Sequence, residues 1–288
     1  MRTQRRQGLA VMAGWLLGGW AAAPGSWAQA QAQPHAPMVR LPQGDLVAAD
    51  IGAILHRGEL VVAMAATDTP PFFHMKNNRL VGSDVRMAQQ LAGELGVTLR
   101  IDRSPRSFNE VVEFVARGGA DLGISKLSHT LARALSVHFS DPYLRLNHAL
   151  LLHRVEFAAL LRERTLSQVI RNFEGSLAVI ANSSFADFAP RHFPRARIVT
   201  YSSWEAVIDA VRRGQVMGAY RDEFEVRRIL QDDPGLVLTL RTVILKDLTD
   251  ALAVAVGVRN ATLLAFVNKF VGLRAEKLTV DSVLKELR

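Results

Sequence analysis

The sequence contains no cysteine, which excludes disulfides, thiolate nucleophiles, cysteine-ligated metal sites and a lipid-modified cysteine anchor. Aromatic residues make up only 7% of the chain, and few of them stand among its scattered arginines. Because nucleic-acid grooves usually interleave aromatic and basic residues, we expect no nucleic-acid partner. The motifs of zinc proteases, serine hydrolases, P-loops and dinucleotide-binding folds are also absent. We therefore expect no metal and no cofactor.

The composition is that of a globular protein, with 49% hydrophobic and 22% charged residues in a chain of 288. The apolar run at 8–23 is shorter than the ~20 residues that a membrane span needs. Arginines precede this run and Ala28-Gln29-Ala30 follows it, which is the pattern of a secretory signal peptide. We expect a signal peptide at 1–30, a flexible leader rich in Gln, Ala and Pro at 31–45, and a periplasmic location.

After the leader, strand and helix patterns alternate along the chain. The expected strands are 59–65, 98–101, 121–125, 177–181, 197–200, 216–220 and 252–258, and the expected helices are 46–56, 84–95, 108–116, 130–135, 184–192, 203–212, 222–230, 261–271 and 280–287. Such alternation predicts parallel α/β sheets, and two units of similar size predict two lobes. The segment 148–154 is expected to link them. The last strand and helices are too few for a third domain, so we expect them to complete the first lobe.

The stretch from Asp121 to Arg133 carries the clearest chemical signal. The hydroxyls of Ser128 and Thr130 follow a predicted buried strand, and Arg133 falls in the first turn of a predicted helix. A cation there opposes the helix dipole, which is reasonable if both act on one anion. Helix N–H groups and a guanidinium would then clamp a carboxylate or phosphate. The alternative is a surface arginine at Arg133 and an ordinary N-cap at Thr130.

Asp121, Ser128-His129-Thr130, Arg133 and Phe139-Ser140-Asp141-Pro142-Tyr143 together resemble the signature of family 3 of the periplasmic solute-binding proteins, the polar amino-acid type. Pro70-Pro71-Phe72 and the run from Gly214 to Asp222 are similar to further segments of this family. The ordered resemblance covers about residues 46–288.

The resemblance implies an α/β, two-lobed periplasmic-binding-protein fold of the Venus flytrap type. Its first lobe is discontinuous and a hinge joins the two lobes. On this basis lobe 1 is expected at 46–148 and 249–288, and lobe 2 at 149–248.

The resemblance also implies a small ligand between the lobes, an amino acid or a related zwitterion or organic acid. Arg133 would pair with its carboxylate, and Ser128 and the backbone at Lys126 would add hydrogen bonds. Asp222 would accept an α-ammonium, and Ser184 would donate to the carboxylate. Asp222 and Ser184 have an alternative explanation as helix N-caps.

The chain departs from the family pattern at several positions near this predicted site. Thr69, close to Phe72, stands where an aromatic ring is common, and Ser183 stands where a glycine is common. Phe185 is either a replacement aromatic wall or part of the core. Lys126 replaces a small residue and either reaches an acidic ligand group or extends to solvent. The expected ligand-binding set is therefore Arg133, Ser128, Asp222, Ser184, Lys126, Thr69, Phe72 and Ser183.

The resemblance further implies that a monomer delivers its ligand to the membrane permease of an ABC transporter and is not itself an enzyme. Two alternatives remain open at this level. One is an enzyme similar to cyclohexadienyl dehydratases, with Asp68, Glu223 or His129 as its acid–base group. The other is a sensory module that passes a ligand signal to a membrane partner.

Overall fold

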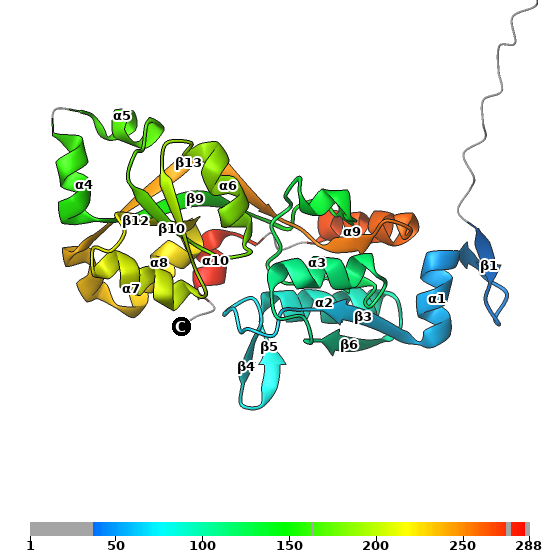
Figure 1. The fold of residues 1–288 in the computed structure, drawn as a ribbon. Coiled ribbons are helices and arrows are strands. Elements are labelled where there is room, and N and C mark those ends of the chain that lie inside the picture. Colours follow the sequence, from blue (N-terminus) through cyan, green and yellow to red (C-terminus); the bar gives the residue numbers. More distant parts are fainter. Residues whose placement is uncertain (1–36, 163, 275–277, 286–288) are drawn as a thin grey trace, which may run out of the picture. The chain divides into compact units, whose positions relative to one another are not determined.

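The computed structural model describes residues 37–162, 164–274 and 278–285. They form an α/β fold with two five-stranded sheets, which Figure 1 shows with the labels used here. The signal peptide expected at 1–30 and the first residues of the expected leader lie outside the described residues. Within the described ranges, no helix is long and apolar enough to cross a membrane.

The first lobe is built on a sheet with the strand order β6-β3-β7-β14-β8. These strands are β3 (Glu59–Ala63), β6 (Thr98–Asp102), β7 (Leu122–Gly123), β8 (Val137–Phe139) and β14 (Ala255–Gly257). β3 pairs in parallel with β6 and β7, whereas β14 pairs antiparallel with β7 and β8. The C-terminal part of the chain thus supplies a strand to the inside of the first sheet, which makes this lobe discontinuous.

Helices bury the apolar sides of the first sheet. They are α1 (Ala49–Arg57), α2 (Ser83–Glu94), α3 (Phe108–Ala116) and α9 (Ala261–Leu273), while α10 (Val280–Lys285) packs against α8 (Glu223–Asp232) of the second lobe. Leu263 and Val267 of α9 and Val283 of α10 belong to the same core as the strand β3. Helical spacing of apolar residues places these side chains on one face, and their burial supplies most of the stabilisation.

The second lobe is built on a sheet with the order β11-β10-β12-β9-β13. Its strands are β9 (Leu144–His153), β10 (Ser176–Ile180), β11 (Arg197–Tyr201), β12 (Gly218–Asp222) and β13 (Leu240–Leu252). Its helices are α4 (Arg154–Leu161), α5 (Leu166–Arg171), α6 (Ser184–His192), α7 (Trp204–Arg212) and α8 (Glu223–Asp232). Ala149 and Leu151 pack into the core on one face, and Leu150 and Leu152 into a separate core on the other. This alternation follows from the two-residue period of a strand.

Two long antiparallel strands, β9 and β13, run side by side (Figure 1). Their ladder extends from the pair Leu144–Leu252 to the pair His153–Leu240 and is interrupted by a register shift between Leu245 and Thr249. The segment expected at 148–154 to link the lobes is instead part of the second sheet, because its residues 148–153 belong to β9 and pair with β12 and β13. β13 was not predicted, because polar residues interrupt its apolar pattern. The described chain also has two small hairpins, β1 (Met38–Arg40) with β2 (Leu46–Ala48) and β4 (His74–Lys76) with β5 (Arg79–Val81).

The predicted fold class is confirmed, while the exact lobe boundaries remain a prediction. Three local expectations were wrong. The leader expected at 31–45 contains β1, and the helix expected from Leu46 begins at Ala49, after β2. The helix expected at 130–135 is only a 3-10 turn at Arg133–Leu135, because Val137 already begins β8 and pairs with β14. Arg133 therefore does not stand at the start of an α-helix of its own, and that part of the clamp argument does not apply to this segment.

Candidate functional site

A small cavity of about 10 Å³ brings together polar side chains from both lobes. Its lining residues are Phe108, Lys126, Ser128, Arg133, Ser184, Phe185, Arg221, Asp222 and Asp250. A cavity of this volume has room for about one water molecule, so a larger solute requires its walls to move apart. Five of the eight residues expected to bind ligand line this cavity. We call it the polar pocket.

Arg133 is held in the polar pocket by the protein itself. Nε and Nη2 donate to Oδ1 of Asn109 at 3.1 and 2.9 Å, and Nη1 donates to the carbonyl of Ser128 at 3.0 Å. Burial lowers the pKa of Arg133 to about 10, so it stays charged at neutral pH. An arginine has five N–H donors. Among the described residues, these bonds use three of them and leave one on each terminal nitrogen.

Arg221 is a second buried guanidinium in the polar pocket, and the sequence analysis did not select it. It follows Tyr220 in β12 and lies over the rings of Phe185 and Trp204, with centroid distances of 5.5 and 5.9 Å. Its Nε is buried with no hydrogen-bond partner in the described part of the chain, and Asp222 Oδ2 lies 3.7 Å away. The signal that could have identified it is its position, between the end of the strand predicted at 216–220 and Asp222. A buried cation without hydrogen bonds is costly unless a ligand satisfies it.

Lys126 forms a contact that neither sequence interpretation anticipated. Its Nζ lies 2.7 Å from Glu225 Oε1 and 3.1 Å from Asp222 Oδ2, so it neither extends to solvent nor waits for an acidic ligand. The side chain is only 3% exposed. Its backbone has φ +47°, and its N–H donates to Asp84 Oδ2 at 2.7 Å. A left-handed backbone favours glycine, so lysine is an uncommon residue in this conformation.

Asp222 has two functions, because it is both an N-cap and an ion-pair partner. Oδ1 accepts from the backbone N–H of Glu225 at 3.0 Å, and Oδ2 faces Lys126. Glu225, which the sequence analysis did not select, also binds Arg228 through Oε2. Burial would raise the pKa of Glu225, but Lys126, Arg221 and Arg228 outweigh it and hold that pKa below its ordinary value. Glu225 is therefore an ionised partner of Lys126.

A hydroxyl network joins the two lobes beside the arginines. Ser128 Oγ lies 2.8 Å from Ser184 Oγ and donates to Asp250 Oδ2 at 2.8 Å. Asp250 was missed because it lies near the end of the unpredicted strand β13. Burial raises its pKa to about 6, and its other oxygen has no hydrogen-bond partner among the described residues. Ser184, with Ser128 and Asp250, thus contributes polar atoms to the pocket rather than a helix cap.

Three of the expected ligand-binding residues do not line the polar pocket. Ser183 is the N-cap of α6 and donates to the carbonyl of Ile180 at 2.7 Å. Thr69 bonds within its own loop, with its hydroxyl 3.4 Å from the carbonyl of Thr67. Phe72 is fully buried, but its ring centroid lies 5.0 Å from Lys126 Nζ. Phe185 is a core residue that also lines the pocket, so its role as an aromatic wall for the ligand stays a prediction.

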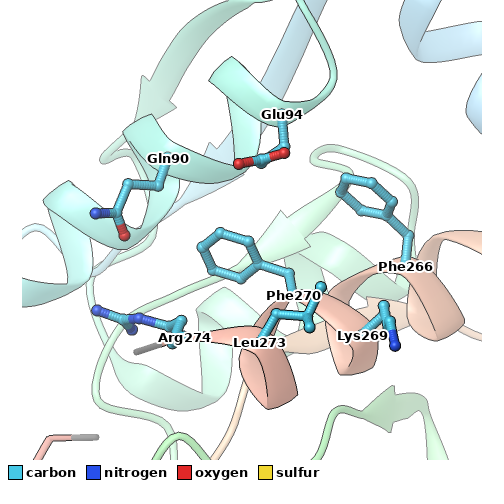
Figure 2. A pocket seen from close by; sticks show the side chains of 7 residues that line it. All are labelled: Gln90, Glu94, Phe266, Lys269, Phe270, Leu273 and Arg274. Carbon is cyan, nitrogen blue, oxygen red and sulfur yellow. The ribbon is translucent and has the colours of Figure 1, made fainter. Parts of the chain in front are cut away.

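A larger cavity of about 440 Å³ lies between α2 and α9 and is distinct from the polar pocket. Figure 2 shows its lining, in which the apolar side chains of Phe266, Phe270 and Leu273 lie near Glu94 and Lys269. No residue expected to bind ligand lines it. In the described ranges, no cluster of three or more His, Cys, Asp or Glu residues could hold a metal ion.

Comparisons with known proteins agree with the fold. A family model described as bacterial extracellular solute-binding proteins, family 3, matches residues 60–282. A solved structure of the amino acid ABC transporter substrate-binding protein AbpA from Streptococcus pneumoniae, bound to L-arginine, superimposes with a TM-score of 0.64 at 25% identity. The match covers 82% of this chain and 96% of that one.

Two curated relatives are similar over part of their length. Membrane-bound lytic murein transglycosylase F 1 of Alkalilimnicola ehrlichii is 33% identical over 134 residues, which is 46% of this chain and 25% of that protein. Cyclohexadienyl dehydratase of Pseudomonas aeruginosa is 28% identical over 175 residues, which is 60% of this chain and 63% of that protein. The aligned part of this chain thus spans about a quarter and just under two thirds of these relatives.

Proposed function

Because the chain belongs to the bacterial extracellular solute-binding proteins of family 3, we propose that it captures a small carboxylate-bearing solute in the polar pocket. The solute class is an amino acid or a related organic acid. The observation that carries this proposal is Arg133, a buried guanidinium held rigidly by Asn109 with two N–H donors left over among the described residues. A fixed guanidinium fork matches a carboxylate in shape and charge.

The other pocket residues fit this role. Arg221 supplies a second guanidinium, and Ser184 supplies a hydroxyl that can turn from Ser128 to donate to a carboxylate. Together with Arg133, these groups come from both lobes, so a bound solute makes contacts that hold the lobes together. The small cavity is consistent with a pocket that opens to admit the solute and closes around it.

We further propose an exported, periplasmic, monomeric protein that delivers its solute to an ABC-type permease. The support is the family membership, the signal-peptide pattern at 1–30, and the likeness to AbpA, which is itself an ABC transporter substrate-binding protein. Copurification with the membrane fraction that contains a permease, in the presence of solute but not in its absence, would test this part.

The side chains suggested for an enzymatic alternative lie outside the polar pocket. Asp68 is exposed and pairs with Arg103, and His129 is exposed and stacks on Phe139. Glu223 is buried but accepts hydrogen bonds from Asn147. This placement supports binding over catalysis, although a dehydratase is among the relatives.

The proposal is tested by thermal unfolding of the purified protein against a panel of amino acids and small organic acids. A solute at 100 times its Kd should stabilise the protein by about 2.7 kcal/mol. For a chain of this size that is an upward Tm shift of roughly 5–10 °C. A protein that unfolds cooperatively but shows no shift with any panel member would contradict the proposal.

A further inference from the structure

The Lys126 ammonium is enclosed by a complete set of ammonium-binding groups. Glu225 Oε1 and Asp222 Oδ2 lie 2.7 and 3.1 Å from Nζ. The rings of Phe72 and Phe224 lie on it with centroid distances of 5.0 and 5.2 Å. Two carboxylates and two aromatic faces are the groups that proteins use to bind a cationic amine. We call this arrangement the ammonium cage.

The protein's own donors use the carboxylate oxygens of the ammonium cage. Asp222 Oδ1 accepts from the backbone of Glu225, and Oδ2 faces Lys126. Glu225 Oε1 accepts from Lys126, and Oε2 accepts from Arg228 at 3.0 Å. A ligand ammonium could enter the cage only by displacing Lys126, which would leave a buried lysine without its partners.

The remaining polar groups of the pocket suit an anion that also carries a neutral oxygen. Arg133 and Arg221 have unused donors within the described residues, and Ser184 adds a hydroxyl. The oxygen of Asp250 that Ser128 does not bind can accept a hydrogen bond from a ligand hydroxyl. When protonated, it can instead donate to a ligand carbonyl. An ammonium placed there would lie among three cations, Lys126, Arg133 and Arg221. The cavity also has two carboxylates, of which Asp222 is already paired with Lys126 and only Asp250 has a free oxygen among the described residues.

We propose that Lys126 occupies the place of a ligand ammonium, so that the pocket selects a small 2-hydroxy or 2-oxo carboxylate over the amino acid with the same carbon skeleton. This inference rests on the proposed function. It narrows the solute class from amino acids and organic acids to organic acids without an amino group. Arg133 and Arg221 bind the carboxylate, and Asp250 binds the oxygen at carbon 2.

Titration calorimetry with matched sets of ligands tests the inference. Each set holds one skeleton constant: lactate, pyruvate and alanine; malate, oxaloacetate and aspartate; 2-hydroxyglutarate, 2-oxoglutarate and glutamate. In the set that binds, the wild-type protein should have a Kd at least tenfold lower for the hydroxy or oxo acid than for the amino acid. Comparing the hydroxy and oxo acids shows whether Asp250 accepts or donates.

Lys126→Gly empties the ammonium cage without straining the backbone, because glycine adopts the left-handed conformation at φ +47° readily. The amino acid of the same set should then bind at least as tightly as the hydroxy or oxo acid. Asn78→Gly is the matched control, since Asn78 is an exposed left-handed residue in the β4–β5 turn and lies outside the pocket lining. It should bind like the wild-type protein.

The outcomes separate this inference from the proposed function. If the wild-type protein binds an amino acid as tightly as its hydroxy and oxo analogues, the role of Lys126 is refuted and solute binding stands. If neither the folded wild-type protein nor the folded Lys126→Gly variant binds any member of any set, the role of Lys126 and the proposed function are both refuted. If Lys126→Gly fails to fold by circular dichroism, the comparison within the wild-type protein still decides the question.

Discussion

Lys126 and Glu225 form a buried ion pair between the two lobes, with Nζ 2.7 Å from Oε1. Lys126 follows β7 of the first sheet, and Glu225 lies on α8 beside the second. Their side chains are only 3% and 5% exposed. Forming such a pair costs desolvation energy, but removing one partner from the formed pair destabilises the protein strongly, because it leaves a buried charge without compensation. The pair therefore stabilises the arrangement of the lobes that the structure shows, and an opening of the pocket has to separate this pair.

Replacing Glu225 by Gln should destabilise the protein by about 3–5 kcal/mol, because it leaves the Lys126 ammonium in a buried site with one charged partner fewer. Urea unfolding would measure this as a lower midpoint. Glu174→Gln is the control: Glu174 pairs with Arg195 on the surface and is 52% exposed, so its loss should change stability by less than about 1 kcal/mol. Equal midpoints for the two variants would contradict the importance of the buried pair.

Arg133→Met should leave a folded protein that has lost most of its affinity for the best solute of the panel. The substitution removes a buried guanidinium that donates to the ligand, and such a loss costs about 2–5 kcal/mol. This corresponds to roughly a 30-fold or larger rise in Kd by calorimetry. Arg195→Ala, which removes an exposed arginine, should bind normally. An unchanged Kd in Arg133→Met would show that Arg133 does not contact the solute.

Arg221→Met should lower affinity strongly while changing stability little. Methionine of similar length fills the space between Phe185 and Trp204 and removes the unpaired Nε, but it also removes the cation that lies 3.7 Å from Asp222 Oδ2, so the two effects on stability oppose each other. We expect a change in stability of less than about 1 kcal/mol, together with at least a tenfold rise in Kd. Thermal unfolding and calorimetry on one preparation measure both. Lower stability with normal affinity would mean that Arg221 is purely structural.

Asp84 predicts a specific dependence of stability on pH. It is fully buried and accepts from the Lys126 backbone N–H and from Tyr143, and burial raises its pKa from 3.8 to about 7. Between these values the folded protein keeps a proton that the unfolded chain has released. The contribution of Asp84 to the free energy of unfolding therefore falls as pH rises from about 4 to about 7, by at most about 1.4 kcal/mol per pH unit. Above about pH 7 this contribution no longer changes with pH.

Asp84→Asn keeps an acceptor oxygen but cannot titrate, so its stability relative to the wild-type protein should increase as pH rises through this window. Urea midpoints at several pH values between 4.5 and 7.5 would measure the difference. Asp45→Asn, at an exposed loop position, should follow the wild-type curve. Parallel curves for Asp84→Asn and the wild-type protein would contradict the raised pKa.

The sequence predicted well those helices whose ends are fixed by neighbouring residues. The bounds of α3 at 108–116 and α6 at 184–192 were predicted correctly, because a serine N-cap and apolar residues at helical spacing mark each helix. The turn at Arg133 was predicted as a helix for a related reason. Thr130 does accept from the Arg133 backbone at 3.2 Å, but the pairing of β8 with β14, which is distant in sequence, stops the helix after one turn.

The site was only partly predictable, because its key contacts join distant segments. The resemblance identified Arg133, Ser128, Ser184, Asp222 and Lys126, all of which line the polar pocket. It did not indicate what Lys126 contacts, since its partners lie 96 and 99 residues further along the chain. Arg221 and Asp250 carry no motif. Only the register of β12 and β13 against β9 brings these two side chains to the pocket.

The covalent attachment of the Lys126 ammonium has a consequence for competition between solutes. A dissolved amine that enters the ammonium cage competes with an ammonium that the folded chain holds there, whose effective concentration is at least millimolar. The amine must also give up its translational freedom on binding, a cost that a covalently attached lysine does not have. An abundance of amino acids in the surroundings therefore does not overcome the lysine by mass action. Only a change in the gene that shortens this side chain would open the cage.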